Sequence, residues 1–544
     1  MLFAAAGKAR FWSVVRQSIY EMLSEKQTDD DYVKKCMRGL MFALNRAECV
    51  GDKNNMNGVI GEVKIWSRQH EIHRLAEDGA NAYFAAVARS NCEEEKMVDP
   101  YNEEGGPSSV RSDYVPKDAY VSEEFAKLEG ERLWPRVWQV ACREEEIPNV
   151  GDVVTYDILD DSITVVRAAQ NVIKAFHNVC PHRGRRLTTG CGHIKQFMCR
   201  FHGWKWDLDG KTTDIIDEDD WGGCLTKEDM NLIAVRVDTW GGFVYINMDQ
   251  EAEPLEKYLA PVIARCDKFE FEKLRYRWYK TVIYPCNWKV TLEAFNEAYH
   301  VQATHPQMLK YIQDYSISGE YGKHSAFWYP PLEDGKSRFE YSDRLGEKPH
   351  SDYRQYALEY FKEMHEQLEA MVTPRSYEAA QRLRTEVSAD APAIEVLTKL
   401  RQFQREAALE DGAGWPDELT PEYVAASHVD WHVFPNQIYL HSSVDGVICY
   451  RSRPNGFDPN SCIFDIWSLV RYAPGKEPKL ERELCENWRD EKWGRILMQD
   501  FSNMEEVQRG MRSRAFKASR TNPLQEKAVS NFHRTIREYL SNSG

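Results

Sequence analysis

The sequence has 544 residues, 42% hydrophobic and 12% aromatic, a composition that excludes both a disordered chain and a small disulfide-stapled scaffold. The length predicts two or three packed domains. A formal net charge of -16 disfavours nucleic acid as a partner, and no run approaches the ~20 apolar residues that a membrane helix needs.

The first residues do not resemble a secretory leader, because Lys8 and Arg10 interrupt a short apolar patch. The sequence therefore predicts a soluble cytoplasmic protein. Its 13 cysteines are an odd number scattered along the chain, which favours reduced thiols, a few of them metal-binding.

Residues 1–112 are predicted to form a helical N-terminal extension and linker. Apolar residues recur there at helical spacing: Phe11, Val15, Ile19 and Met22, then Ile65, Ile72 and Leu75. The extension ends in an acidic, turn-rich stretch over residues 93–109, which has the composition of a linker.

Residues 113–252 are predicted to form a small antiparallel β domain. It opens with a short helix for which Ser122 is the expected cap. Short strand-like runs separated by turns follow, over residues 153–158, 163–166, 172–176 and 243–246.

Residues 253–544 are predicted to form a second, mixed domain, so the fold class is α+β. A helix is expected over 288–300 and late strands over 437–441, 447–451 and 462–469. A further helical stretch near 350–410 carries an apolar stripe: Tyr353, Tyr356, Tyr360, Met364 and Leu368.

Two short loops of the β domain each offer one cysteine and one histidine. Cys180 and His182 stand in C-x-H spacing, and Cys199 and His202 in C-x-x-H spacing, each pair before a glycine that permits a tight turn. Two thiolates and two imidazoles also suit a structural zinc, which is the alternative interpretation. Zinc sites more often pair like with like, whereas this spacing resembles a Rieske 2Fe-2S site, where two cysteines hold one iron and two histidines the other.

Respiratory-chain Rieske proteins carry one further cysteine in each loop, and the two form a clamping disulfide. The corresponding neighbours here are Arg185, Arg200 and Phe201. This difference resembles the oxygenase-type Rieske domain and implies a potential near the low end of roughly -150 to +300 mV. Four nearby residues lack ligand spacing and are predicted to be packing or surface residues: Cys191, Cys224, His177 and His193.

A second constellation lies in and after the predicted helix over 288–300. On one helix Glu293, Glu297 and His300 fall on one face, and His305 follows after the helix bends or ends before a proline. Two histidines five residues apart are a weak signal alone. Their position after a Rieske-like motif favours a mononuclear non-heme iron held by two histidines and one carboxylate.

The missing carboxylate is assigned to Asp500. It begins the pattern D-x4-E-x2-Q-x-G, which ends at Gly510 and resembles a helix of Rieske oxygenases. Without that resemblance, Asp500 would be interpreted as an ordinary surface charge.

Both constellations, in this order, resemble the large catalytic alpha subunit of Rieske non-heme iron aromatic ring-hydroxylating oxygenases over residues 115–544. The resemblance implies a β-rich Rieske domain and then a helix-grip (START-like) catalytic domain, in which a curved antiparallel sheet wraps a long helix. It implies cluster ligands and Fe(II) ligands at matching positions: Cys180, His182, Cys199 and His202 for the cluster, and His300, His305 and Asp500 for the iron.

Three features depart from the family pattern. Glu297 stands where an Asp usually joins the first iron histidine to a Rieske histidine of the neighbouring subunit, as in some members that act on quaternary amines. Glu297 is the expected bridging residue, with a solvated acid as the alternative. Ala294 replaces an often-seen Asn, and His305 and Asp500 are 195 positions apart. The long span predicts that the helices near 350–410 are an inserted lid or an oligomer contact.

The resemblance implies a terminal oxygenase component that hydroxylates, mainly by cis-dihydroxylation, a hydrophobic aromatic or polycyclic substrate. One alternative is a Rieske monooxygenase or demethylase that acts on an amine or ether. An alternative of another class is an electron-transfer or zinc-stabilised binding protein. Aromatic residues after the iron motif either line the substrate pocket or belong to the core: Tyr311, Tyr315, Phe327, Trp328 and Tyr329.

The partners follow from what the sequence lacks. It has no nicotinamide or flavin fingerprint and no plant-type ferredoxin spacing, so a separate NAD(P)H-dependent reductase is expected, with or without a ferredoxin. The resemblance further implies a homotrimer, with or without a small beta subunit.

Overall fold

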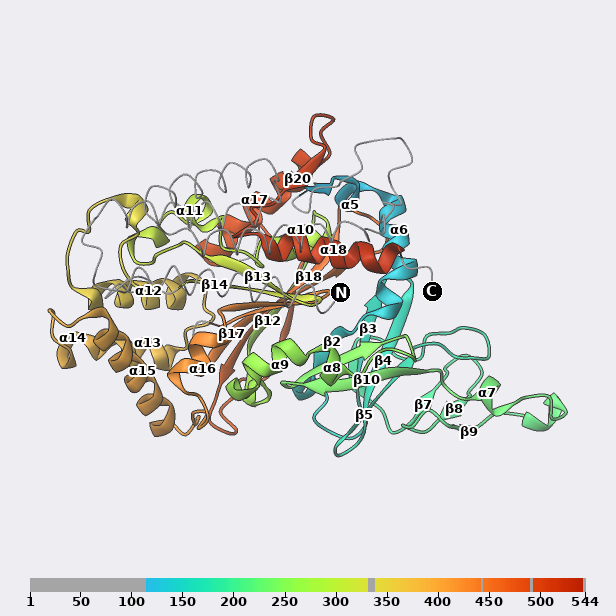
Figure 1. Cartoon of the computed structure of the whole chain (residues 1–544). Helices are drawn as coiled ribbons and strands as arrows, with labels where there is room; N and C mark the ends of the chain where they lie inside the picture. Colours follow the sequence, from blue (N-terminus) through green and yellow to red (C-terminus); the bar gives the residue numbers. More distant parts are fainter. Residues whose placement is uncertain (1–113, 331–337, 442–443, 490–492, 542–544) are drawn as a thin grey trace, which may run out of the picture. The chain divides into compact units, whose positions relative to one another are not determined.

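The computed structural model describes residues 114–330, 338–441, 444–489 and 493–541 (Figure 1). These residues belong to one compact unit, Ser109–Gly544. The helical extension predicted over residues 1–112 lies outside the described residues. None of the described helices is long and apolar enough to cross a membrane.

Two antiparallel sheets form the β-rich part that contains the cysteine loops. The larger sheet has the order β2-β11-β10-β5-β4-β3-β6, with bounds Gln139–Arg143, Phe243–Asn247, Ala234–Trp240, Val172–His177, Asp161–Ala169, Asp152–Ile158 and Cys191–His193. The smaller sheet has the order β7-β8-β9, with bounds Phe197–Met198, Lys205–Trp206 and Thr212–Asp214. The four strand runs predicted here are present as β3, β4, β5 and β11.

Short elements precede these sheets. They are β1 (Tyr114–Pro116), α5 (Asp118–Val121) and α6 (Glu123–Arg132). Ser122 caps α6 as predicted, because its side-chain oxygen accepts a hydrogen bond from the Phe125 N–H at 3.1 Å. β1 pairs antiparallel with β20 (Ala518–Arg520), which ties the start of the described chain to its last part.

A separate small core supports the cysteine loops. It contains Val153 and Val166, which face each other across β3 and β4, and the edge-to-face pair Phe176 and Phe197. Trp206 is fully buried in the same cluster, which also includes the two loop cysteines. The loops therefore rest on a packed base.

An eight-stranded sheet forms the frame of the second part. Its order is β13-β14-β15-β16-β17-β18-β12-β19, with bounds Ile317–Tyr321, His324–Trp328, Asp430–Val433, Gln437–Leu440, Gly446–Pro454, Cys462–Arg471, Leu274–Tyr284 and Arg482–Cys485. β19 pairs parallel with β12, and the other neighbours are antiparallel. The three predicted late strands are present as β16, β17 and β18.

Three helices pack against this sheet and against one another. α10 (Trp288–Glu293) lies on β17 and β18, α17 (Arg495–Met511) packs on α10, and α18 (Lys527–Ser541) lies along β13 and β14 (Figure 1). The predicted α+β class and its antiparallel helix-gripping sheet are confirmed. Short helices occupy the connections: α7 (Lys227–Met230), α8 (Leu255–Tyr258), α9 (Ala260–Cys266), α11 (Val301–Thr304) and α16 (Pro421–Ala426).

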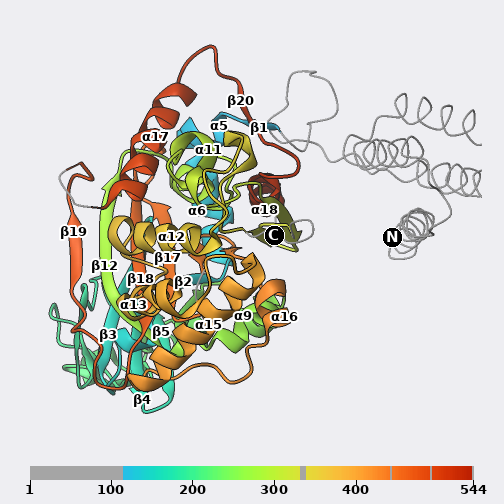
Figure 2. The same cartoon turned by 90° about the vertical axis from the view of Figure 1, so that its left-hand side faces the viewer.

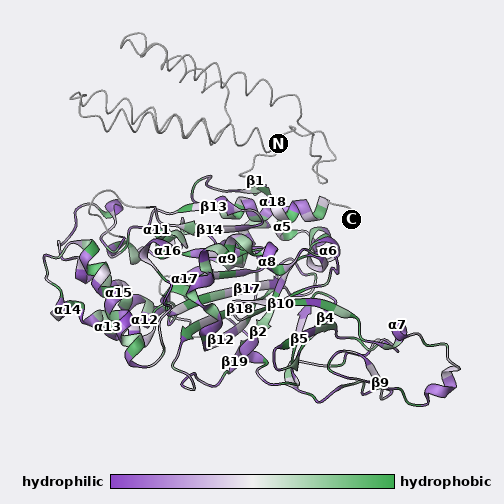
Figure 3. Ribbon diagram, turned by 60° about the horizontal axis from the view of Figure 1, so that its bottom comes forward, coloured by the Kyte–Doolittle hydropathy of each residue, from purple (hydrophilic) through white to green (hydrophobic). Residues whose placement is uncertain are grey.

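The helical stretch predicted near 350–410 forms four helices: α12 (Tyr353–Gln367), α13 (Pro374–Gln381), α14 (Leu383–Glu386) and α15 (Ala393–Glu410). Figure 2 shows α12, α13 and α15 side by side. Their ribbons carry both hydrophilic and hydrophobic residues in Figure 3, as amphipathic helices do. The predicted stripe of α12 is buried at Tyr356, Tyr360 and Met364.

Candidate functional site

The two cysteine loops have the same local fold. In each, a glycine N–H donates to the cysteine carbonyl four residues earlier at 2.9 Å, from Gly184 to Cys180 and from Gly203 to Cys199. Both glycines have positive φ, +74° and +75°, a conformation that residues with a Cβ rarely adopt. The two loops thus present one thiol and one imidazole each in matching positions.

The four candidate ligands of the loops lie together. The His182 and His202 ring centroids are 4.6 Å apart, and Trp204 stacks on His182 at 5.1 Å. Both cysteines are buried, and their thiols are in hydrogen-bond contact. Burial lowers the pKa of His182, and the nearby His202 and Arg183 lower it further, which favours the neutral imidazole that binds metals.

The Nδ1 atoms of His182 and His202 provide a direct test of fit. Both are buried and have no hydrogen-bond partner among the described residues. Orphaned buried nitrogens are costly and call for a partner outside the protein. Two thiols and two such nitrogens are the donor set of a Rieske 2Fe-2S cluster, so these residues fit it.

The four neighbouring residues without ligand spacing lie apart from this group. Cys191 and Cys224 are exposed free thiols. His193 is exposed and pairs with Asp152 at 2.9 Å. His177 lies 4.0 Å from Asp161, at the end of β5.

The second constellation differs from its prediction in one respect: a continuous helix over 288–300 is wrong. α10 ends at Glu293, and α11 begins only at Val301. Phe295 turns into the core, where it stacks on Tyr450 with ring centroids 4.0 Å apart. The Glu297 carboxylate accepts the N–H groups of Tyr299 and His300, which offers the backbone an alternative to helical bonding.

The break between α10 and α11 separates Glu293 and Glu297, which were expected on one face of a single helix. Glu293 accepts a hydrogen bond from the Tyr120 hydroxyl at 3.0 Å and contacts His533 Nε2 at 2.5 Å. Glu297 instead contacts His300, its Oε1 lying 2.6 Å from Nδ1. Only Glu297 therefore belongs to the metal site.

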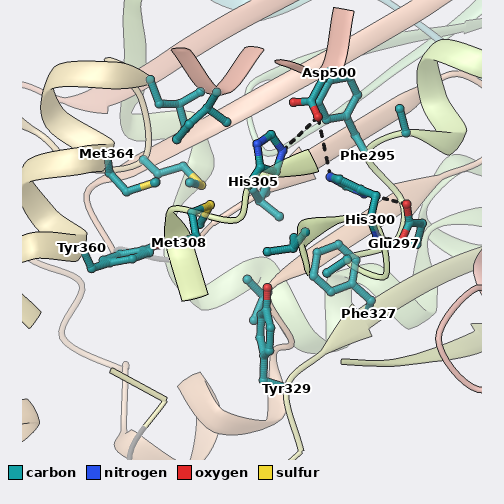
Figure 4. A pocket seen from close by; sticks show the side chains of 18 of the residues that line it. Phe295, Glu297, His300, His305, Met308, Phe327, Tyr329, Tyr360, Met364 and Asp500 are labelled. Carbon is teal, nitrogen blue, oxygen red and sulfur yellow. Dashed lines mark hydrogen bonds and ion pairs between the residues drawn. The ribbon is translucent and has the colours of Figure 1, made fainter. Parts of the chain in front are cut away.

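His300, His305 and Asp500 converge although they come from distant segments. One ligand atom from each lies within 4.8 Å of the others. Asp500 Oδ1 is 2.9 Å from His305 Nε2 and 3.7 Å from His300 Nε2, as Figure 4 shows. α17 supplies Asp500, which is only 4% exposed, so it is not the ordinary surface charge of the alternative interpretation.

Both histidines are held through Nδ1, which directs Nε2 toward the shared space. Glu297 holds His300, and the Gln499 side-chain oxygen lies 3.0 Å from His305 Nδ1. Gln307 donates to the same oxygen at 2.9 Å. Two imidazole nitrogens and one carboxylate fit a mononuclear non-heme iron, and fixed Nδ1 partners are typical of metal-binding histidines.

Charge at this site also favours a cation. Partial burial lowers the pKa of His300, but the carboxylates of Glu297 and Asp500 outweigh it and raise this pKa to about 9. The ring therefore holds a proton that a metal ion must displace, so metal binding releases a proton.

A cavity of about 100 Å³ opens beside the three residues. Figure 4 shows His305 and His300 near Asp500, Met364 and Tyr360 from α12 to one side, and Tyr329 across from Asp500. Most of the remaining lining is apolar: Phe295, Val301, Met308, Phe327, Leu368, Met371, Val429, Leu440, Tyr450 and Ile496 among others.

The sequence identified only part of this lining. Of the five aromatic residues after the iron motif, Phe327 and Tyr329 line the cavity. Tyr311 is buried without lining it, Trp328 stacks on His428 instead, and Tyr315 is exposed. The contributions of Tyr360 and Met364 were missed, although their helical stripe was visible. The partners Gln499 and Gln307 were also missed; the only signal was the position of Gln499 next to Asp500.

Comparison with protein families gives two matches. Residues 137–221 match the Rieske [2Fe-2S] domain. Residues 271–542, half of the chain, match the catalytic domain of the ring hydroxylating alpha subunit.

Curated proteins give partial matches. The carnitine monooxygenase oxygenase subunit of Acinetobacter pittii (strain PHEA-2) is 30% identical over 203 residues, 36% of this chain and 54% of its own length. Benzene 1,2-dioxygenase subunit alpha of Pseudomonas putida is 31% identical over 191 residues, 34% of this chain and 42% of its own length. The chain thus spans about half the length of the curated relatives it matches.

Solved structures share the fold at low identity. The quaternary ammonium Rieske monooxygenase CntA in complex with L-carnitine has a TM-score of 0.52 at 18% identity, covering 79% of this chain and 97% of that chain. Naphthalene 1,2-dioxygenase with bound indole has a TM-score of 0.52 at 20% identity, covering 79% and 93%.

Proposed function

Because the chain belongs to the ring-hydroxylating oxygenase alpha-subunit family, with a Rieske 2Fe-2S domain and a catalytic domain of the kind that binds mononuclear iron, we propose that it is a terminal oxygenase component. It uses dioxygen and relayed electrons to hydroxylate a small, largely apolar substrate, with cis-dihydroxylation as the main reaction. The observation that carries the proposal is the convergence of His300, His305 and Asp500 beside an apolar cavity.

The proposed ligands are the donor atoms that converge at each of the two sites. The thiols of Cys180 and Cys199 and the Nδ1 atoms of His182 and His202 hold the cluster. The Nε2 atoms of two histidines and one carboxylate hold the iron: His300, His305 and Asp500. When bound, the cluster supplies electrons and the iron supplies a centre that activates dioxygen.

Glu297 is the positioning residue of the metal site. Its carboxylate fixes the His300 ring through Nδ1 and at the same time holds the backbone N–H of His300 at 3.1 Å. These two contacts fix the orientation of the His300 ring, so that Nε2 faces the cavity. We further propose that Glu297 bridges to a Rieske histidine of a neighbouring subunit.

The assembly proposal rests on where the two sites lie. Figures 1 and 2 place the region of the cysteine loops, around β7 and β8, far from α11 within the described part of one chain. Because electron transfer requires nearby groups, an electron from the cluster of one chain would then have to pass to the iron of a neighbouring chain. We propose a homotrimer, with or without a small beta subunit, that receives electrons from an NAD(P)H-dependent reductase, directly or through a ferredoxin.

The cavity limits the size of the substrate. Its volume of about 100 Å³ compares with the ~150 Å³ of an engineered apolar cavity that binds benzene. Because this volume is the smaller of the two, we propose that the substrate is no larger than about one ring.

A second candidate is oxidative dealkylation of an amine or ether. Glu297, with its extra methylene, favours it, and so does the similarity to carnitine monooxygenase oxygenase subunits. The two reactions differ in product: dealkylation releases an aldehyde, whereas dihydroxylation retains every carbon atom in one product.

Metal analysis tests the proposal. Protein purified without air is expected to contain about three irons and two sulfides per chain and little zinc. His300→Ala is expected to lose about one iron and to keep both sulfides. His193→Ala, which alters an exposed histidine outside both sites, is the matched control and keeps all of them.

Two results would contradict the proposal. Iron content that is the same in His300→Ala as in the native protein would remove the mononuclear site, leaving an electron carrier. Zinc without sulfide would remove the cluster as well and favour the zinc-stabilised binding protein.

A further inference from the structure

The cavity contains one cation that the metal site does not use. Arg338 is the only lysine or arginine among the described residues that line the cavity. Its guanidinium carbon lies 3.5 Å from the centroid of the Tyr329 ring. Tyr329 lies across the cavity from Asp500 in Figure 4, and Arg338 packs on this Tyr329 ring.

The guanidinium has no carboxylate partner among the described residues, and its Nε is buried without a hydrogen bond. Among the described residues, two acids of the adjoining segments are already engaged. Asp314 pairs with Arg344 at 2.7 Å, and Glu340 pairs with Lys348 at 2.7 Å. The cavity acids are engaged as well, since Glu297 and Asp500 contact the iron histidines.

Arg338 is nevertheless held in place. Its carbonyl accepts hydrogen bonds from the N–H groups of Gln313 at 2.8 Å and Glu340 at 3.0 Å. Stacking on Tyr329 orients the plane of the guanidinium. An oriented guanidinium presents a planar fork of donors that matches a carboxylate.

We propose that Arg338 anchors the substrate, and that the substrate carries a carboxylate which pairs with this guanidinium while its apolar body extends toward His300 and His305. This inference rests on the proposed oxygenase function and names its substrate class. A cation at an apolar wall is unfavourable unless it is paired, and an incoming carboxylate supplies the pair. The same cation repels a simple amine, so the inference disfavours a purely cationic substrate.

Binding of matched small molecules to the full-length, iron-loaded protein tests the inference by calorimetry. The probes are benzoate, its neutral analogue benzamide and the cation benzylammonium; butyrate and butyramide form a smaller pair that needs no space for a ring. Native protein is expected to bind the carboxylate of a pair about 10- to 100-fold more tightly than the amide, and benzylammonium least tightly.

Variants assign the preference to the residue. Arg338→Gln is expected to bring the carboxylate-to-amide ratio close to one, and Arg338→Lys to restore part of it. Arg384→Gln, at an exposed arginine of α14 that does not line the cavity, is the matched control and keeps the native ratio.

Three outcomes would overturn the anchor: equal binding of carboxylate and amide by the native protein, an unchanged ratio in Arg338→Gln, or no binding of either carboxylate up to ~10 mM. Iron and sulfide measured on the same samples separate this failure from failure of the oxygenase proposal. Equal binding of carboxylate and amide by native protein that contains about three irons rejects the anchor alone. A carboxylate-to-amide preference that depends on Arg338, measured in protein without mononuclear iron, rejects the oxygenase proposal alone.

Discussion

Within the part of the chain that the structure describes, Asp430 is a buried acid that lacks the hydrogen bonds a buried carboxylate requires. It is the first residue of β15 and lies between Phe327 and Leu440, its partners on the neighbouring strands. Its side chain is fully buried, and neither carboxylate oxygen has a hydrogen-bond partner among the described residues. Burial therefore raises its pKa well above the ordinary value, so Asp430 keeps its proton to higher pH in the folded protein than in the unfolded chain.

This predicts a stability that falls as pH rises. The unfolded chain loses the Asp430 proton near pH ~3.9, but the folded chain keeps it to higher pH. The folded state thus binds more protons above that pH, and its free energy of unfolding decreases by up to about 1.4 kcal/mol per pH unit until the folded pKa is reached.

Asp430→Asn is expected to remove this slope, because the amide does not titrate. Denaturant unfolding at several pH values between about 5 and 8 measures it. Asp390→Asn, at an exposed aspartate, is the control and should keep the native slope. Parallel curves for the native protein and Asp430→Asn would show that Asp430 is ionised in the folded state.

At this scale, sequence reasoning found residues that local motifs define. Cys180 and His182 lie two positions apart, so their spacing alone indicates a shared centre. Gln499 and His305 are separated by 194 positions, and only the folded chain brings them together. No sequence motif marks Asp430, because its raised pKa arises from burial in the folded chain.

The attachment of α13 to the sheet decides the position of one cavity wall. Three residues at the start of α13 converge on the buried Asp445 carboxylate: Thr373 Oγ1 at 3.1 Å, Ser376 Oγ at 3.0 Å and Arg375 Nη2 at 2.8 Å. α12 packs on α13 and contributes Tyr360 to the cavity. Asp445 therefore indirectly fixes the wall that the substrate meets.

Asp445→Asn is expected to loosen this wall. It removes the charge that three donors share, and weakening such a buried pair costs about 2–3 kcal/mol. Amide hydrogen exchange in α13 should accelerate and the substrate KM should rise, while iron content stays native. The matched control is Asp411→Asn, because Asp411 is more exposed and pairs with the same Arg375. An equal effect of both variants would argue against an anchor at Asp445.

Helices and strands were predictable where packing is regular. β16, β17 and β18 are buried along almost their whole length, and their apolar, β-prone runs located them. The stretch over 288–300 was predicted as one helix because its composition favours one. Two interactions that periodicity does not encode end it early: the stacking of Phe295 on Tyr450 and the backbone contacts of Glu297. The pattern also located α12, but its role as a cavity wall depends on Asp445.

The Rieske part and the catalytic sheet share one hydrophobic core. Buried residues from both belong to the same cluster, among them Val140, Tyr245, Ile466 and Trp467. The Tyr245 hydroxyl donates to the side-chain oxygen of Gln437 at 2.7 Å across the boundary. The two domains predicted from the sequence thus share one packed core. The order of the motifs along the chain did not indicate this.

Arg451 is the polar centre of this boundary. From β17 it donates to the carbonyls of Val140 and Ala141 on β2 at 3.2 and 2.5 Å, and it pairs with buried Asp465 at 2.7 Å. Burial raises the pKa of Asp465, but Arg451 and then Arg453 outweigh it and hold this pKa at about 2. The depressed pKa stabilises the fold above pH ~3.9, and this stability is lost as pH falls toward 2.

Arg451→Met is expected to have two effects at once. The acid unfolding midpoint should move to higher pH, because Asp465 loses one of its two arginines, and the free energy of unfolding should fall by about 3–5 kcal/mol. In the native protein, we expect the loss of cluster absorbance and the change in tryptophan fluorescence to coincide. In Arg451→Met they should separate, because the β2 carbonyls have lost their hydrogen-bond donor. Arg453→Met isolates the first effect, since Arg453 pairs with Asp465 at 2.8 Å but donates to neither β2 carbonyl. Its two signals should shift together, and coincident signals in Arg451→Met would mean that the shared apolar core alone couples the domains.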